Sequence, residues 1–266
     1  MVLTYIHWSP DPEIFRIGSM AVRWYGVLFA LGFIFGYIIL QRMFKMEGVP
    51  IKLLDSLTTY MIIGTIIGAR LGHCLFYEPD YYLAHPMKIL AVWEGGLASH
   101  GAAIGIILAL ILFSYVKKKP FLWVVDRIVI VVALAGFLIR MGNLMNSEIF
   151  GHVTSLPWGF YFLRASDPKE ALDPRHPTQI YEGFSYLLIF FYLTWYYYHK
   201  KGDPEHGFLF GMFLILVFGV RFFLEFLKEP QVGFEATMTL NMGQLLSIPF
   251  VLVGVFFVVR SRRLRN

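Results

Sequence analysis

The sequence predicts an all-α, polytopic membrane protein with about seven transmembrane helices. Of its 266 residues, 57% are hydrophobic and only 15% are charged, and the mean hydropathy is +0.61. Soluble domains are usually nearer half apolar and carry about a quarter of charged residues. Long apolar runs recur along the chain, each near the roughly twenty residues that a helix needs to cross a bilayer. We therefore expect a single transmembrane domain over residues 1–266.

Seven apolar segments are expected to cross the membrane as helices. They cover residues 21–41, 55–76, 91–115, 121–140, 179–198, 207–227 and 241–260. Most connections are short, but the polar segment 141–178 is long and predicts an extracytoplasmic head or arm insertion that caps the protein between spans four and five. Residues 1–18 lack a basic stretch followed by an apolar core, so no cleavable signal peptide is expected. Because Cys74 is the only cysteine, an internal disulfide and a cysteine-based metal cluster are excluded.

The basic residues predict how the chain is oriented in the membrane. Twelve of them fall in the loops and the tail on one side: Arg42, Lys45, Lys52, Lys117, Lys118, Lys119, Lys200, Lys201, Arg260, Arg262, Arg263 and Arg265. Seven fall on the other side: Arg16, Arg23, Lys88, Arg164, Lys169, Arg175 and Lys228. Cytoplasmic loops carry the excess of lysine and arginine. The N-terminus is therefore expected outside and the C-terminus in the cytoplasm.

Polar residues gather in one stretch at the outer end of the fourth span. The apolar run ends there and is followed by Arg140, Asn143, Asn146 and Glu148. Ionisable groups at such a depth are costly and usually face a protein interior or a wet cavity. One cation, two amides and a carboxylate can hold an anionic head group there beside a reacting centre. The alternative is structural: an arginine that reaches the membrane surface, followed by Asn and Glu side chains that cap a loop.

Three further residues indicate chemistry, and each also has a structural interpretation. His100, near the outer end of the third span, can act as a general base because histidine ordinarily titrates near pH 6.5, or it can be a buried, hydrogen-bonded residue. Arg221 and Glu225 are four residues apart and share a helix face. They can serve a function together, or they can form an ion pair that only locks two helices.

Read in order, the polar and glycine-containing blocks resemble the family of bacterial phosphatidylglycerol–prolipoprotein diacylglyceryl transferases. The resemblance covers residues from about 20 to 255. Its blocks are residues 23–26, 68–72, 76–77, 93–96, 99–101, 140–151, 176–182, 221–230 and 242–247. The sequence departs from the usual family pattern at packing positions, which are Ile139 before Arg140, Leu144 after Asn143, and Ala102.

The resemblance implies a reaction and a role for particular residues. The diacylglyceryl group of phosphatidylglycerol moves to the lipobox cysteine of a prolipoprotein, a thioether forms, and glycerol phosphate is released. The nucleophile is a thiolate, and the leaving phosphate needs stabilisation, to which the planar fork of arginine is suited. The resemblance implies that Arg140 and Arg221 bind the phosphate, that His100 is the thiol base and that Tyr25 binds the head group. It also implies that Asn143, Asn146 and Glu148 hold the site together by hydrogen bonds, that Gly151 contacts the substrate and that Glu225 tunes Arg221.

The resemblance also implies a location and partners. The enzyme is expected in the bacterial cytoplasmic (inner) membrane with its active site toward the outer face, and with no metal, cofactor or nucleic acid. Its partners are phosphatidylglycerol and the signal peptides of prolipoproteins, which enter sideways from the bilayer. Two rival classes remain, a lipid transporter or flippase and a non-catalytic scaffold. A transporter or flippase predicts internal repeats, of which the sequence shows none. A scaffold gives no reason for polar clusters on separate spans to gather at one face.

Overall fold

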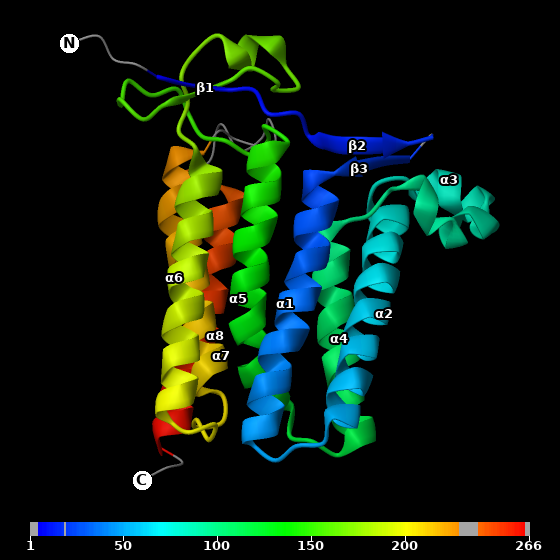
Figure 1. Ribbon diagram of the computed structural model, residues 1–266, viewed down its shortest axis with the longest axis vertical. Helices are drawn as coiled ribbons and strands as arrows, with labels where there is room; N and C mark the ends of the chain where they lie inside the picture. The colour runs from blue at the N-terminus through cyan, green and yellow to red at the C-terminus, as the bar shows by residue number, and fades with distance from the viewer. Residues whose placement is uncertain (1–4, 19, 229–238, 264–266) are drawn as a thin grey trace. The chain divides into compact units, whose positions relative to one another are not determined.

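The computed structural model describes residues 5–18, 20–228 and 239–263 (Figure 1). The chain folds into two compact units. Unit 1 consists of residues 1–39 and 126–266, and unit 2 consists of residues 40–125. Helix α1 (Trp24–Met46) begins in unit 1 and ends in unit 2, and α5 (Phe121–Met145) begins in unit 2 and ends in unit 1.

Unit 2 is built on two helices that pack closely along their length, α2 (Ile51–Phe76) and α4 (Ser99–Lys117). Glycines line their contact: a Cβ on Gly68 would lie 2.4 Å from the carbonyl oxygen of Gly101 and 2.8 Å from the Cα of Gly105. Lipid tails are as apolar as leucine, so helices in a membrane associate largely through such close packing of small residues. The two backbones are therefore held at a separation that only glycine permits.

The segment between α2 and α4 is irregular and is organised by one buried arginine. It contains α3 (Pro79–Ala84) and the 3-10 helices η1 (Pro86–Leu90) and η2 (Val92–Glu94). Arg70 of α2 donates hydrogen bonds to four backbone carbonyls: those of Lys88, Ile89, Gly95 and Gly96. Because its donors are taken up by the loop, Arg70 acts here as an anchor for the backbone.

The third span is shorter than the sequence predicted. We expected a helix from residue 91, but α4 begins at Ser99. Gly95 and Gly96 have φ angles of +90° and +66°, a conformation that interrupts a right-handed helix and that glycine adopts without strain. His100 is consequently the second residue of α4 and does not lie a few residues inside the helix.

Unit 1 contains the remaining long helices: α6 (Thr178–His199), α7 (Phe208–Leu224) with the 3-10 helix η4 (Glu225–Leu227), and α8 (Met242–Arg263). Helix α5 continues to Met145, five residues beyond the predicted end of the fourth span, so Arg140 and Asn143 lie in its last turns. At the other end of α5, the buried carboxylate of Asp126 accepts hydrogen bonds from the backbone N–H groups of Gly207 and Phe210 and thereby caps the start of α7.

The membrane-spanning character of the fold is confirmed. Among the residues that the structure describes, six helices are long and apolar enough to cross a bilayer: α1, α2, α4, α5, α7 with η4, and α8. Helix α6 has 22 residues, a similar length, and carries several tyrosines. The chain is thus an all-α, multi-pass membrane protein. Helix α6 matches the remaining predicted span in position and length, but it is not among the six helices that are apolar enough to cross a bilayer.

Short strands hold the polar segment after α5, a detail that the sequence did not predict. Strand β1 (Ile6–Trp8) pairs in parallel with β4 (Phe160–Phe162), and β2 (Glu13–Ile17) pairs antiparallel with β3 (Met20–Arg23). The indole of Trp8 donates to the carbonyl of Leu144 at 2.8 Å. The segment also contains the 3-10 helix η3 (Pro168–Ala171). It is therefore anchored to both the N-terminal strand and the end of α5.

Candidate active site

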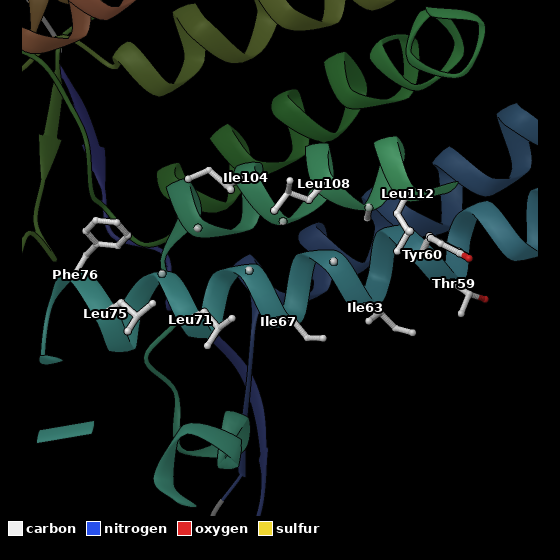
Figure 2. A pocket seen from close by; sticks show the side chains of 16 residues that line it. Thr59, Tyr60, Ile63, Ile67, Leu71, Leu75, Phe76, Ile104, Leu108 and Leu112 are labelled. Atoms are coloured by element: carbon white, nitrogen blue, oxygen red, sulfur yellow. The ribbon is translucent and has the colours of Figure 1, made fainter. Parts of the chain in front are cut away.

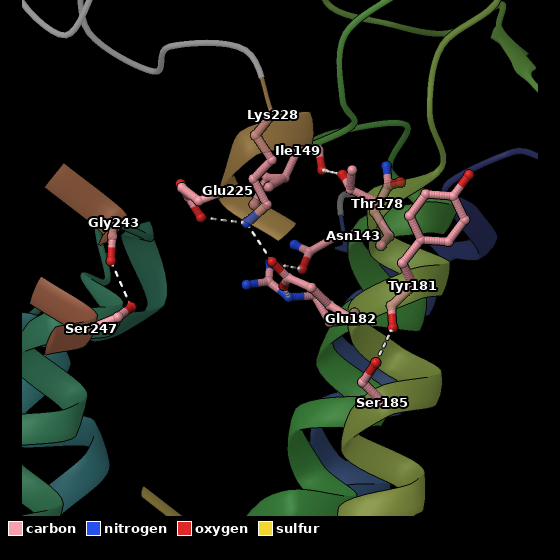
Figure 3. Close-up of polar contacts among 12 residues, drawn as sticks. Asn143, Ile149, Thr178, Tyr181, Glu182, Ser185, Glu225, Lys228, Gly243 and Ser247 are labelled. Carbon is pink, nitrogen blue, oxygen red and sulfur yellow. Dashed lines mark hydrogen bonds and ion pairs between the residues drawn. The ribbon is translucent and has the colours of Figure 1, made fainter. Parts of the chain in front are cut away.

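The candidate site is centred on a buried carboxylate in the second turn of α6 (Figure 3). The Glu182 side chain is 1% exposed and forms ion pairs with Arg140 of α5 and with Lys228, which follows η4. Lys228, 3% exposed, also lies with its Nζ 3.3 Å from Oε2 of Glu225. Buried charges are tolerated when they are paired. Two cations and two carboxylates from separate parts of the chain thus form one network, which we call the Glu182 network.

A second set of polar contacts leads from Arg140 to the turn after α5. Nη1 of Arg140 donates to Oδ1 of Asn143 at 3.2 Å. The Glu148 carboxylate in turn accepts from the amide groups of Asn143 at 2.8 Å and Asn146 at 3.1 Å. The guanidinium of Arg140 is therefore held on one edge by a carboxylate and on another by an amide. These two contacts involve Nε and Nη1 of Arg140, and the guanidinium has five N–H donors in all.

The first turn of α6 fixes the turn that carries Glu148. Nε2 of Gln179 donates to the Glu148 carbonyl at 2.7 Å, and Oγ1 of Thr178 donates to the carbonyl of Ile149 at 2.9 Å. Ile149 has a φ of +61°, which is uncommon for a β-branched residue and is maintained only where the surroundings hold it. Buried side chains of α6 therefore determine the backbone path beside Asn146 and Glu148.

Gly151 joins this turn to the segment that carries Lys228. Its N–H donates to the carbonyl of His176 at 2.9 Å, and the next residue, His152, donates to the carbonyl of Leu227 at 2.8 Å. A Cβ on Gly151 would lie 2.2 Å from that Leu227 oxygen and 2.8 Å from Cγ2 of Thr178. Gly151 therefore has a packing role that the sequence did not specify.

Gly151→Ala is expected to reduce activity at least about tenfold and to destabilise the protein by about 1–3 kcal/mol, because the added methyl group must push Leu227 and the adjacent Lys228 aside. Gly219→Ala is the matched control, since a Cβ on Gly219 meets nothing within 4 Å. Thermal unfolding in detergent and initial rates check both variants. A fully active and stable Gly151→Ala protein would contradict the role of this contact.

Tyr25, the second residue of α1, contacts the helix that carries Arg140. A Cβ on Gly142 would lie 2.8 Å from Cδ2 of the Tyr25 ring, so the ring packs against α5 where only glycine fits. The charges of Glu148 and Arg140 both act on the Tyr25 hydroxyl. Tyr25 is thus in unit 1 beside the residues with which the sequence grouped it.

Glu225 has a different partner from the one that the sequence suggested. The spacing of four residues favoured Arg221, but among the described residues Glu225 pairs with Lys228. Glu225 opens η4, and Gly243 of α8 packs on its carboxyl group. Arg221 lies in the last turn of α7, and its charge acts on the Tyr186 hydroxyl together with those of Arg140 and Glu182.

His100 belongs to unit 2, whereas the other predicted site residues belong to unit 1. Its side chain is exposed, and its ring lies 5.5 Å from that of Phe76 and 5.7 Å from that of Tyr77, measured between centroids. Aromatic neighbours on one side and exposure on the other leave the imidazole accessible.

Two residues of the Glu182 network were not predicted as site residues. Residues 176–182 form one of the blocks of the family resemblance, but the sequence did not identify Glu182 as the partner of Arg140. Lys228 was counted only among the loop cations. Its position three residues after Glu225 was the available signal, because residues so spaced can meet on one side of a helical turn.

A histidine of lowered basicity lies just before α6. His176 precedes α6, and its Nδ1 lies 3.3 Å from the hydroxyl of Tyr181. Burial, together with the neighbouring imidazole of His152, holds the pKa of His176 below the ordinary histidine value. The lowered pKa favours the neutral form of the imidazole.

Comparisons with known proteins cover nearly the whole chain. Residues 12–260 match the family model described as prolipoprotein diacylglyceryl transferase. The phosphatidylglycerol–prolipoprotein diacylglyceryl transferase of Tolumonas auensis is 49% identical over 263 residues, which cover 97% of this chain and 98% of that protein. Proteins of the same name from Chloroherpeton thalassium and Porphyromonas gingivalis are each 46% identical, covering 97% of this chain and 95% of their own.

Proposed function

The chain belongs to the prolipoprotein diacylglyceryl transferase family, and on this premise we propose that it transfers the diacylglyceryl group of phosphatidylglycerol to the lipobox cysteine of a prolipoprotein. This is the first step of bacterial lipoprotein maturation. The proposal rests mainly on the contacts of Arg140. Near the end of a membrane helix, its guanidinium forms an ion pair with Glu182 and donates a hydrogen bond to Asn143. Such a group is suited to the phosphate of a lipid head group.

The reaction is a displacement at carbon. The cysteine sulfur, as thiolate, attacks the glyceryl carbon that bears the phosphate ester. A carbon–sulfur bond forms, the carbon–oxygen bond breaks, and its electron pair leaves on the oxygen of glycerol phosphate. The thiol proton passes to a base. Catalysis therefore requires a thiolate and a cation that stabilises the departing phosphate.

Arg140 takes the second of these tasks in the proposal. The contacts with Glu182 and Asn143 fix the plane of the guanidinium before substrate binds, so little reorganisation is needed when charge develops on the leaving oxygen. Arg221 is assigned as a further cation for the phosphate, and Tyr25 as a contact for the head group. Asn143, Asn146 and Glu148 maintain the geometry through their hydrogen bonds.

His100 is assigned as the base that accepts the thiol proton. His100→Gln is expected to lower the rate at pH 7 by about a hundredfold, since general bases typically contribute 10²–10⁴. The deficit should shrink as the pH rises toward the ordinary thiol pKa of about 8.5, where the cysteine ionises without help. Rates from pH 6 to 9 check this, with His85→Gln, an exposed histidine of the same unit, as the control. Nearly wild-type rates for His100→Gln at pH 7 would remove the base from the mechanism.

The proposed location is the bacterial cytoplasmic membrane, with the N-terminus and the active site outside and the C-terminus inside. The distribution of basic residues supports this orientation. In unit 1, the turn between α6 and α7 and the end of α8 lie at the end of the helices opposite β1 (Figure 1). A membrane-impermeant thiol reagent applied to intact cells should label Lys169→Cys and not Lys201→Cys. The reverse labelling pattern would contradict the orientation.

The function is tested with purified protein in detergent and phosphatidylglycerol that is labelled in its diacylglyceryl part. Lipobox peptides with cysteine or serine at the acceptor position are compared, and the release of glycerol phosphate is followed. Transfer to the cysteine peptide alone, with one glycerol phosphate per lipidated peptide, is the expected result. Folded protein that neither transfers label nor releases glycerol phosphate would point instead to lipid transport.

A further inference from the structure

Unit 2 has an apolar groove that the proposed chemistry does not use (Figure 2). It runs along the contact of α2 and α4 and has a volume of about 640 Å³. Its lining consists of aliphatic and aromatic side chains and glycines, with Thr59 and Tyr60 at one end. We call it the α2–α4 groove.

Two rows of exposed side chains form the walls of the α2–α4 groove. On α4 the row is Ile104, Leu108 and Leu112, and on α2 it includes Ile63, Ile67, Leu71 and Leu75. A spacing of four residues keeps each row on one helix face. Figure 2 shows the side chains of both rows along the two facing helices. Glycines at the contact of α2 and α4 let the two backbones approach and have no side chains, so the floor of the groove is nearly flat.

One end of the groove lies at His100. This residue precedes Ile104 by four and so continues the α4 row by one helical turn. Phe76, which lines the groove at the end of α2, lies 5.5 Å from the His100 ring. The accessible imidazole is therefore the polar terminus of an otherwise apolar path.

The length of the groove distinguishes between the occupants that a membrane offers. Thr59 and Phe76 are separated by about 25 Å along α2, at about 1.5 Å per residue. A lipid tail reaches only to the bilayer midplane, about 15 Å from the edge of the hydrocarbon core. The apolar segment of a signal peptide has about 7–15 residues and measures about 10–22 Å as a helix. Only the upper part of this range exceeds the reach of a lipid tail, so a peptide helix of about 15 residues, which crosses the midplane, matches the groove better than a single acyl chain.

We propose that the α2–α4 groove binds the apolar helix of the prolipoprotein signal peptide and delivers its acceptor cysteine to His100. The inference rests on the proposed function. The cleavage region of a signal peptide follows its apolar segment, and the lipobox cysteine lies there. A peptide whose apolar helix begins near Thr59 thus ends beside the imidazole. An apolar helix lying in an apolar groove is a common mode of peptide recognition.

Adjacent residues on each helix provide matched variants. Leu108 lines the groove and is 60% exposed, while Ile107 does not line it and is 52% exposed. Ile67 and Ile66, 53% and 46% exposed, form the same kind of pair on α2. A tryptophan at Leu108 or Ile67 fills the groove, whereas one at Ile107 or Ile66 adds the same bulk elsewhere on the surface of the same helix.

The kinetic test compares two acceptors, a prolipoprotein with its complete signal peptide and a short lipobox peptide without the apolar segment. In Leu108→Trp and Ile67→Trp, the ratio of kcat/KM for the long acceptor to that for the short one should fall about tenfold, corresponding to about 1.4 kcal/mol of lost binding. In Ile107→Trp and Ile66→Trp the ratio should stay at the wild-type value. Equal ratios in all four variants would overturn the inference and leave the transferase function intact.

Crosslinking supplies a readout that needs no turnover. The native chain has one cysteine, which is buried, so a single cysteine can be introduced at Leu108 or, as the control, at Ile107. A prolipoprotein with a cysteine in the middle of its apolar segment should crosslink to Leu108→Cys and not to Ile107→Cys. A crosslink between two copies of this chain would make the groove a dimer interface, and a raised KM for phosphatidylglycerol in Leu108→Trp would assign it to a lipid tail; either result overturns the inference.

Discussion

Replacing Arg140 with lysine is expected to lower kcat by about a hundred- to a thousandfold, the usual effect of removing a preorganised donor to a developing oxyanion. Lysine keeps the positive charge, but it lacks the planar fork that bonds Glu182 and Asn143 simultaneously. The cation remains near the phosphate without a fixed direction. Initial rates of label transfer at saturating phosphatidylglycerol measure the loss in kcat.

The matched control is Arg164→Lys. Arg164 is a partly exposed arginine that forms a 3.0 Å ion pair with Asp11. Exposed pairs contribute about 1 kcal/mol or less, so this substitution should leave kcat unchanged. If Arg140→Lys, shown to be inserted and folded, turned over at the wild-type rate, a point charge would suffice and the argument from the arginine fork would fail.

Glu182→Gln is expected to give the largest loss of stability, about 3–5 kcal/mol, together with a loss of activity. The glutamine leaves Arg140 and Lys228 without the carboxylate that bridges them, and Glu225 alone cannot balance both cations. Removing one partner of a buried ion pair is costly because the remaining charge is uncompensated. The thermal unfolding midpoint in detergent and the transfer rate measure the two effects.

A double variant separates charge balance from catalysis. Glu182→Gln combined with Lys228→Met removes one negative and one positive charge, which restores neutrality among the four groups of the Glu182 network. Stability should recover by about 1–3 kcal/mol relative to Glu182→Gln, a typical coupling between residues in contact. Activity should not recover, because Arg140 still lacks its anchor. Glu13→Gln, which disrupts an exposed pair with Arg16, should have little effect on either measurement.

Lys228→Met could instead destabilise the Glu182→Gln protein by as much as it destabilises the wild-type protein. The two residues would then be energetically independent. Recovery of activity in the double variant would contradict the anchoring role of Glu182 toward Arg140.

The bounds of the long helices could largely be predicted, because the bilayer sets the length of an apolar run. The error at the third span has a local cause, the positive φ angles of Gly95 and Gly96, which depend on the loop that Arg70 holds. The strands β1 and β4 have three residues each and pair across about 150 positions of the chain. A pattern of alternation cannot be recognised over so few residues.

In the candidate site, the sequence predicted local contacts better than distant ones. Asn143, Asn146 and Glu148 lie within one short stretch, and their hydrogen bonds follow from that closeness. Glu182 and Lys228 are far apart in the chain and meet only through tertiary packing. Glu225 has cations at two nearby positions, Arg221 four residues before it and Lys228 three residues after it, and spacing along the chain does not decide which of them it pairs with.

The bond that breaks tests the central claim most directly. Phosphatidylglycerol is prepared with a heavy oxygen isotope in the bridge between the diacylglyceryl carbon and phosphorus, and the products formed with a cysteine lipobox peptide are analysed by mass spectrometry. Attack of sulfur at carbon predicts that all of the isotope leaves in glycerol phosphate and that the lipidated peptide carries none at the linkage. Isotope retained on diacylglycerol or on the peptide would mean that the phosphorus–oxygen bond breaks, which contradicts the proposed displacement.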